Sequence, residues 1–257
     1  AVGDSSLYTL NGGDYNTAIG YLSLRLATTA DNCTAAGYNA LGSNTTGSSN
    51  TAVGFNSLTS NTTASNCTAV GNSALAANTT GTQNSGFGVN TLAGTTTGTY
   101  NIAVGVNSLI SNTTGSYNVG LGVNSLLAAT TSSGNVAIGY DTLKTCTTGV
   151  TYSVAVGFES QKSVTSGDNS LKSVTDAGHQ NVAIGREALE SNTGGDDNVA
   201  VGYRALEANT NGSDNVGVGR VALGSNTTAD GNTAVGYYAL SANTTGTNNS
   251  ALGYRSL

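Results

Sequence analysis

Small, apolar and glycine residues recur along the chain at a fixed spacing. A tripeptide of a small residue, an apolar residue and glycine, such as Ala52-Val53-Gly54, occurs 15 times in the 257 residues. Successive glycines are 17 residues apart, except for a step of 18 that ends at Gly157 and a step of 28 that ends at Gly185. Leucine stands four residues after the glycine in 14 of the 15 copies. This regularity is that of a tandem repeat, which has to be explained before any single motif.

The pattern within one repeat predicts two short strands and a turn. Thr51 to Val53 alternates larger and smaller side chains with period two, as a strand does. A glycine at a fixed place, such as Gly54, indicates a positive φ or a close approach of two backbones. The segment Asn44 to Gly47, with the sequence Asn-Thr-Thr-Gly, has turn chemistry. Seventeen residues are too few for a β-α-β unit, but they suit one coil of a solenoid.

We therefore predict an all-β fold, a parallel β-solenoid of about 15 coils with 17 residues in each coil. Equivalent positions would stack at the strand spacing of about 4.8 Å, so 15 coils would extend over about 70 Å. Asparagines four residues before the glycine, such as Asn50 and Asn101, would form a ladder of side-chain amides. Leu109, Leu126 and Leu206 would be buried, and the Asn-Thr-Thr turns would be exposed. A coil lined by alanine and glycine is narrow, so we expect one apolar ridge to be buried against identical chains.

The spacing also predicts how the chain is organised. Regular repeats cover residues 1–160 and 181–257, and an insert or irregular coil covers 161–180. Insertions in solenoids often lie on the binding face, which makes Lys162, Lys172 and His179 candidate receptor contacts; a hairpin without a binding role is the alternative. Because neither end of the sequence has a capping element, we expect the solenoid to continue beyond one or both ends.

Two stretches carry a resemblance to a known family. Asn50 to Leu58 reads NTAVGFNSL, and Asn232 to Leu240 reads NTAVGYYAL. Both are similar to the head repeats of trimeric autotransporter adhesins, and more closely to related repeats in bacteriophage tail-fibre and other virion-fibre proteins. The resemblance implies a left-handed β-roll assembled as a homotrimer and located outside the cell. The 17-residue period is longer than the adhesin head repeat.

These observations favour a structural role. We expect a segment of an extracellular or virion fibre, a rigid shaft or head that could also contact a glycan or protein receptor. A bacterial trimeric adhesin or a self-assembling extracellular filament is the first alternative. A fibre-borne polysaccharide-degrading enzyme is the second alternative. An ice-binding solenoid is disfavoured, because it would require flat threonine arrays and the threonine pairs here belong to turns.

Composition argues against other functions. Only 9% of the residues are charged and the net charge is −6, which disfavours nucleic acid and anionic membranes as partners. No apolar run approaches the roughly 20 residues of a membrane span. The single histidine, the missing phosphate-loop motif and the lack of metal-ligand spacing lead us to expect no catalytic, cofactor or metal site.

Several side chains allow specific expectations. Arg204 lies one repeat after Glu187, so an ion pair between coils is expected, whereas Glu190 and Glu207 would repel each other. The position after the glycine is often tyrosine, with Arg186 and Arg220 among them; it is either edge packing or a ligand-binding stripe. The three cysteines would be free thiols, or would form symmetric bonds between chains. Six asparagines that begin Asn-Thr-Thr turns match the glycosylation pattern: Asn44, Asn61, Asn78, Asn112, Asn226 and Asn243.

Overall fold

The computed structural model describes residues 1–146, 150–160 and 180–257. These residues form two compact units, Ala1–Asn124 and Ser125–Leu257. Both units are all-β and consist of solenoid coils of about 17 residues, with no helix among the described residues. The predicted parallel β-solenoid is therefore confirmed. Its handedness and the division at residues 161–180 stay predictions.

Each repeat contributes one three-residue strand. The strands of the first unit are β1 (Thr17–Ile19), β2 (Thr34–Ala36), β3 (Thr51–Val53), β4 (Thr68–Val70), β5 (Ser85–Phe87), β6 (Ile102–Val104) and β7 (Val119–Leu121). Those of the second unit are β8 (Val136–Ile138), β9 (Val154–Val156), β10 (Val182–Ile184), β11 (Val199–Val201), β12 (Val216–Val218), β13 (Thr233–Val235) and β14 (Ser250–Leu252). The 15 sequence copies thus give 14 strands in the described residues, because the first copy forms only an isolated bridge between Val2 and Ile19.

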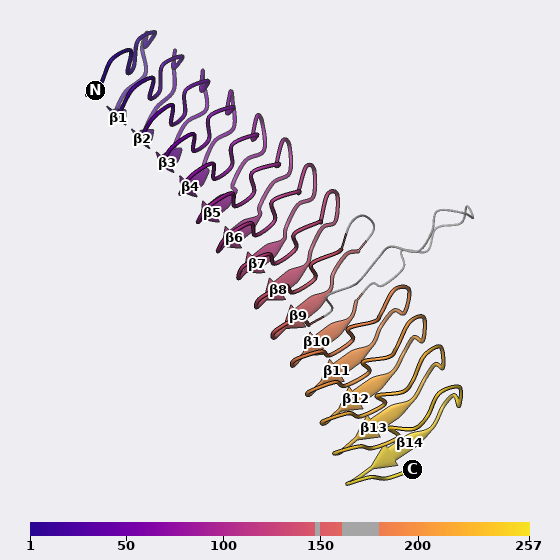
Figure 1. The fold of residues 1–257 in the computed structure, drawn as a ribbon. Helices are drawn as coiled ribbons and strands as arrows, with labels where there is room; N and C mark the ends of the chain where they lie inside the picture. The colour runs from indigo at the N-terminus through magenta and orange to yellow at the C-terminus, as the bar shows by residue number, and fades with distance from the viewer. Residues whose placement is uncertain (147–149, 161–179) are drawn as a thin grey trace. The chain divides into compact units, whose positions relative to one another are not determined.

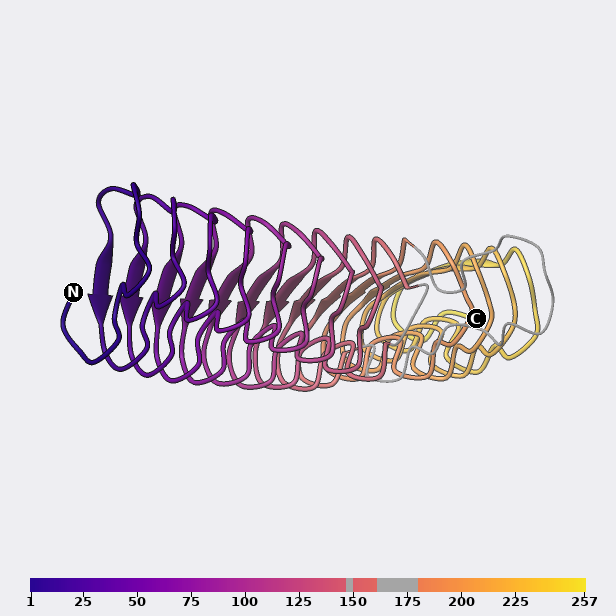
Figure 2. The same ribbon diagram turned by 90° about the horizontal axis from the view of Figure 1, so that it is seen from above.

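The strands of each unit pair in parallel and in chain order, as Figures 1 and 2 show. Pairing joins equivalent repeat positions, for example Ala52 with Ala69 in the first unit. The register survives both irregular steps, since Val154 pairs with Val136 on one side and with Val182 on the other. The ladder of strands therefore keeps its register from β8 through β9 to β10.

Glycine at the end of each strand is required for two reasons. Gly54 has φ of 134°, a conformation that side chains other than that of glycine rarely adopt. A Cβ atom on Gly54 would also lie 2.4 Å from the carbonyl oxygen of Gly71 in the next coil. The sequence left open whether positive φ or close approach explains this glycine, and the structure shows both.

The prediction of a second strand in each coil is wrong. In the segment after the glycine, the second and fourth residues adopt left-handed backbone conformations; Asn56 has φ of 51° and Leu58 has φ of 49°. This alternation excludes an extended strand. The segment still bonds to its neighbour, because the backbone N–H of Leu58 donates to the carbonyl oxygen of Ala74 at 3.0 Å.

Leucine and small residues fill the interior. Leu109, Leu126 and Leu206 have no exposed surface, which confirms the predicted leucine column. The central strand residue, such as Ala52 or Ala183, points inward and is equally buried. Burial of leucine offsets its left-handed backbone, which is disfavoured by about 1–2 kcal/mol per residue.

Two asparagine ladders satisfy the polar groups inside the coils. The strand ladder is formed by the asparagine that directly precedes most strands. In it, Asn101 Nδ2 donates to Asn84 Oδ1 at 3.1 Å, and the Asn101 backbone N–H donates to the same oxygen at 3.0 Å. The turn ladder is formed by the first residue of each Asn-Thr-Thr turn, where Asn61 Nδ2 donates to Asn44 Oδ1 at 2.6 Å. The strand ladder was predicted. The turn ladder was not, because a polar residue in a turn sequence normally faces solvent.

Candidate functional site

The outward strand face, formed by the first and third residues of each strand, exposes apolar side chains in both units. In β1 to β13 the central residue of the strand is buried while its two neighbours are partly or fully exposed. Ile138 and Ile184, for example, expose 37% and 41% of their surface. The sequence did not decide whether this ridge fills the coil or faces outward. In both units it faces outward, and the leucines fill the coil.

The composition of the outward strand face changes along the chain. β1 to β4 place threonine first, as in Thr17 and Thr34, and an aliphatic residue third. β8 to β12 carry valine first and valine or isoleucine third. In the second unit, five consecutive strands therefore present only β-branched side chains over about 19 Å. Contiguous exposed apolar surface of this kind marks an interaction site.

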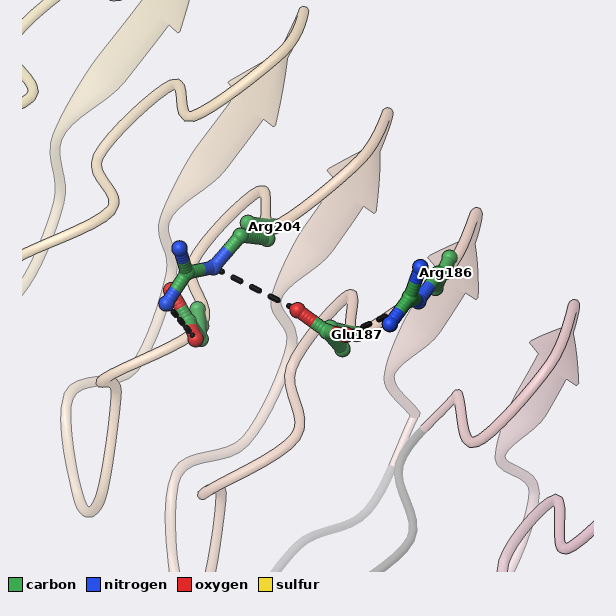
Figure 3. A network of polar contacts seen from close by, with 4 residues as sticks. Arg186, Glu187 and Arg204 are labelled. Atoms are coloured by element: carbon green, nitrogen blue, oxygen red, sulfur yellow. Dashed lines mark hydrogen bonds and ion pairs between the residues drawn. The ribbon is translucent and has the colours of Figure 1, made fainter.

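A charged network lies beside this face in the second unit (Figure 3). Arg204 Nε lies 3.4 Å from Glu187 Oε2, which confirms the ion pair expected between coils. Arg186 Nε lies 2.9 Å from Glu187 Oε1, and Arg204 Nη2 donates a hydrogen bond to Glu207. That hydrogen bond is the main reason that the pKa of Arg204 is raised. Glu187 thus bridges two arginines that come from neighbouring coils.

Three carboxylates gather around this network. Oxygen atoms of Glu187, Glu190 and Glu207 lie within 4.8 Å of one another. Glu190 and Glu207 were expected to repel each other across the coils. Arg204 supplies a positive charge between Glu187 and Glu207, so it already performs the neutralisation that a cation would provide.

The aromatic position after the glycine forms stacked columns. Tyr38 and Phe55 stack at 5.0 Å with an interplanar angle of 13°, and Tyr237 and Tyr254 at 5.1 Å with 4°. Stacking turns the ring faces toward the neighbouring coils and leaves edges and hydroxyl groups toward solvent. This geometry favours the edge-packing interpretation for these stacks. Arginines replace rings at two places in the second unit, where Arg186 and Arg220 lie over tyrosine rings.

The cysteines are buried free thiols, as one of the two sequence interpretations expected. Cys33 and Cys67 take the place of asparagine in the strand ladder, and each Sγ atom lies 3.3 Å from a glycine carbonyl oxygen. Cys146 occupies the turn-ladder position. Burial raises the pKa of Cys146 to about 11 and also raises the pKa of Cys33 and Cys67. A buried thiol cannot reach another chain, so bonds between chains through these residues would require the coil to open.

The asparagines that match the glycosylation pattern belong to the turn ladder. Asn44, Asn61, Asn78, Asn112 and Asn226 have no exposed surface, and Asn243 is half-buried. The expectation of exposed Asn-Thr-Thr turns is thus wrong for the asparagine, whereas the second threonine, such as Thr46, is exposed. Each Nδ2 atom donates to a carbonyl oxygen three residues on, as Asn44 does to Gly47 at 2.9 Å. A glycan on Nδ2 would have to replace these bonds inside the folded coil.

The candidate receptor contacts Lys162, Lys172 and His179 lie outside the described residues. Within the described part, the structure contains no helix with the length and hydrophobicity of a membrane span. No protein-family model matches the chain, and no curated protein or solved structure is significantly similar to it.

Proposed function

We propose that this chain is a structural segment of an extracellular or virion fibre, in which copies of the chain pack together through the outward strand face. The observation that carries the proposal is the partly exposed row of valine and isoleucine on β8 to β12. A soluble protein rarely leaves such a surface open to water. A second copy of the chain offers a surface of matching period, because its coils have the same spacing.

The interior supports a mechanical role. Each coil is joined to the next by strand pairing, by backbone bonds outside the strands and by asparagine ladders. Repeated coils with these bonds resist bending and local opening, as a shaft or head requires. The resemblance to fibre repeats agrees with this role and suggests three copies in the assembly.

The test is the oligomeric state of the purified chain and of a double variant, Ile138→Lys with Ile184→Lys. Both positions are exposed in the single chain, where a lysine can keep its charge in water. For the unmodified chain, we expect light scattering to show an oligomer of three copies. For the double variant, we expect a monomer. Circular dichroism should be unchanged.

The control adds the same two charges elsewhere in the second unit, as Ser225→Lys with Thr228→Lys. Both residues are exposed in a turn. This variant should assemble like the unmodified chain. A stable monomer before any substitution, or equal assembly of both lysine variants, would overturn the proposal.

A further inference from the structure

Arg220, in the second unit, is surrounded by tyrosines and has no acidic partner among the described residues. The guanidinium carbon of Arg220 lies 5.4 Å from the ring centres of Tyr203 and Tyr237 and 5.6 Å from that of Tyr238. Its Nη1 donates to the hydroxyl oxygen of Tyr237 at 2.7 Å. Arg220 is exposed, and its guanidinium group makes no other hydrogen bond to the described residues. We call Arg220 and these three tyrosines the Arg220 cluster.

The repeat that carries Arg220 lacks acidic residues at the two positions where neighbouring repeats have glutamate. The position occupied by Glu187 in its repeat is Val221 here, and the position of Glu190 and Glu207 is Gly224. Arg186, at the same repeat position as Arg220, instead pairs with Glu187 at 2.9 Å. Among the described residues, no carboxylate forms an ion pair with Arg220. Two equivalent arginines thus differ in whether their charge is compensated.

We propose that the Arg220 cluster binds a carboxylate-bearing polysaccharide. The guanidinium group offers parallel N–H donors that fit a carboxylate in a bidentate manner. The tyrosine rings hold it in place through cation–π contacts, and their hydroxyls and edges are left for hydrogen bonds and packing to sugar units. This site goes beyond the proposed structural role, and its residues are the first or second after the strand-end glycine rather than part of the outward strand face.

The charge of the chain selects among anionic polymers. A net charge of −6 repels a dense polyanion such as nucleic acid. Double-stranded DNA carries one negative charge per about 1.7 Å of its length, whereas a uronic-acid glycan carries at most one per sugar unit. A short glycan segment can therefore place one carboxylate on Arg220 while bringing fewer negative charges close to the chain. The coil spacing of about 4.8 Å is also comparable with the length of one sugar unit in an extended glycan.

The experiment measures binding of polygalacturonate fragments and of neutral dextran to the complete chain by calorimetry and affinity electrophoresis. We expect saturable binding to polygalacturonate, which added salt weakens, and none to dextran. Arg220→Gln should reduce the affinity at least about tenfold, as expected when a charge-assisted hydrogen bond is lost. Arg220→Lys should also lose affinity, because a lysine lacks the planar pair of donors.

Arg186→Gln is the matched control and should keep the affinity of the unmodified chain. Thermal melts and light scattering on each variant separate a binding loss from misfolding or altered assembly. The proposal is overturned if polygalacturonate does not bind, if dextran binds equally, if Arg220→Lys keeps full affinity, or if Arg186→Gln loses as much as Arg220→Gln.

Discussion

The two units share an interior and differ in what they show to solvent. Residues 1–124 contain four charged residues, Asp4, Asp14, Arg25 and Asp31, whereas the other 18 charged residues follow residue 124. Threonine leads the first four strands of the first unit, whereas valine leads the first five of the second. Both units nevertheless have the same buried leucines, inward alanines and asparagine ladders. The fixed repeat positions thus specify the coil, and the variable positions specify which surface each unit offers.

The largest effect should come from the strand-end glycines, and it should be equal in the two units. Gly54→Ala would place a Cβ 2.4 Å from a glycine carbonyl oxygen of the next coil, and Gly202→Ala would place one 2.6 Å from the equivalent oxygen. Both positions also have a backbone conformation that alanine disfavours. We expect each to lower the free energy of unfolding by at least about 3 kcal/mol, measured by urea denaturation.

Gly217→Ala is the control for these substitutions. Gly217 occupies the inward strand position, where its neighbours in the ladder are Ala200 and Ala234. An added Cβ there would lie 3.2 Å or more from its nearest neighbours, so we expect a change below about 1 kcal/mol. Unequal losses for Gly54→Ala and Gly202→Ala would show that the interiors of the two units are not equivalent.

Periodicity predicts those parts of the fold that repeat in every coil. The glycine, leucine and strand-asparagine columns could be assigned because each requires the same residue in nearly every copy. The left-handed backbone of residues such as Leu58 could not be predicted, since leucine disfavours it and only burial and bonds to the next coil stabilise it. The burial of Asn44 was missed for a similar reason, because stacking of coils converts a turn residue into an interior one.

Contacts between surface side chains could be predicted only where the two residues occupy the same position in consecutive repeats. The pair of Glu187 and Arg204 follows from a separation of 17 residues. The surroundings of Arg220 do not, because Tyr238 lies at a different repeat position from Tyr203 and Tyr237. A comparison of Val221 and Gly224 with their acidic equivalents was the signal that could have revealed the uncompensated charge.

Alkaline pH should destabilise the second unit through Cys146. Burial raises the pKa of this thiol to about 11, whereas the unfolded chain should have the ordinary value of 9.0. The native state then holds the proton more tightly, so stability is complete below pH 9.0 and decreases as the pH rises toward about 11. Two pKa units correspond to a loss on the order of 3 kcal/mol.

Cys146→Asn restores the usual turn-ladder residue and removes this titration. Denaturation curves at pH 8 and at pH 11 or so should differ less for the variant than for the unmodified chain. The same alkaline loss in both proteins would assign it to other groups, such as tyrosines.

The turn ladder should respond to opposite substitutions in the two units. In the first unit it is interrupted at Thr95, and the buried Oδ1 of Asn78 has no hydrogen-bond partner. In the second unit Asn192, Asn209 and Asn226 are joined without interruption. We expect Asn209→Thr to cost about 1–3 kcal/mol, because it leaves Asn192 Oδ1 without its donor.

The reverse change, Thr95→Asn, should stabilise the first unit by about 0.5–1.5 kcal/mol, because it supplies a donor to Asn78 Oδ1. Chemical denaturation of both variants is the measurement. If Thr95→Asn were destabilising, the coil at that position would be too narrow for the amide, and the ladder would depend on local packing as well as on hydrogen bonds.

The smallest effect should come from the charged network, which only the second unit has. The Arg204 side chain is 43% exposed and that of Glu187 is 14% exposed, so water and salt screen much of their attraction. Glu187→Gln removes the charge that faces both Arg186 and Arg204, yet Arg204 keeps its bond to Glu207. We expect a loss of at most about 1 kcal/mol at low salt, which decreases further at about 1 M salt. The first unit has no such pairs among its described residues, so salt should not change its free energy of unfolding. Hydrogen exchange can follow the two units separately. A loss of several kcal/mol would mean that the network stabilises the coil itself, and the division between a shared interior and a variable exterior would not hold there.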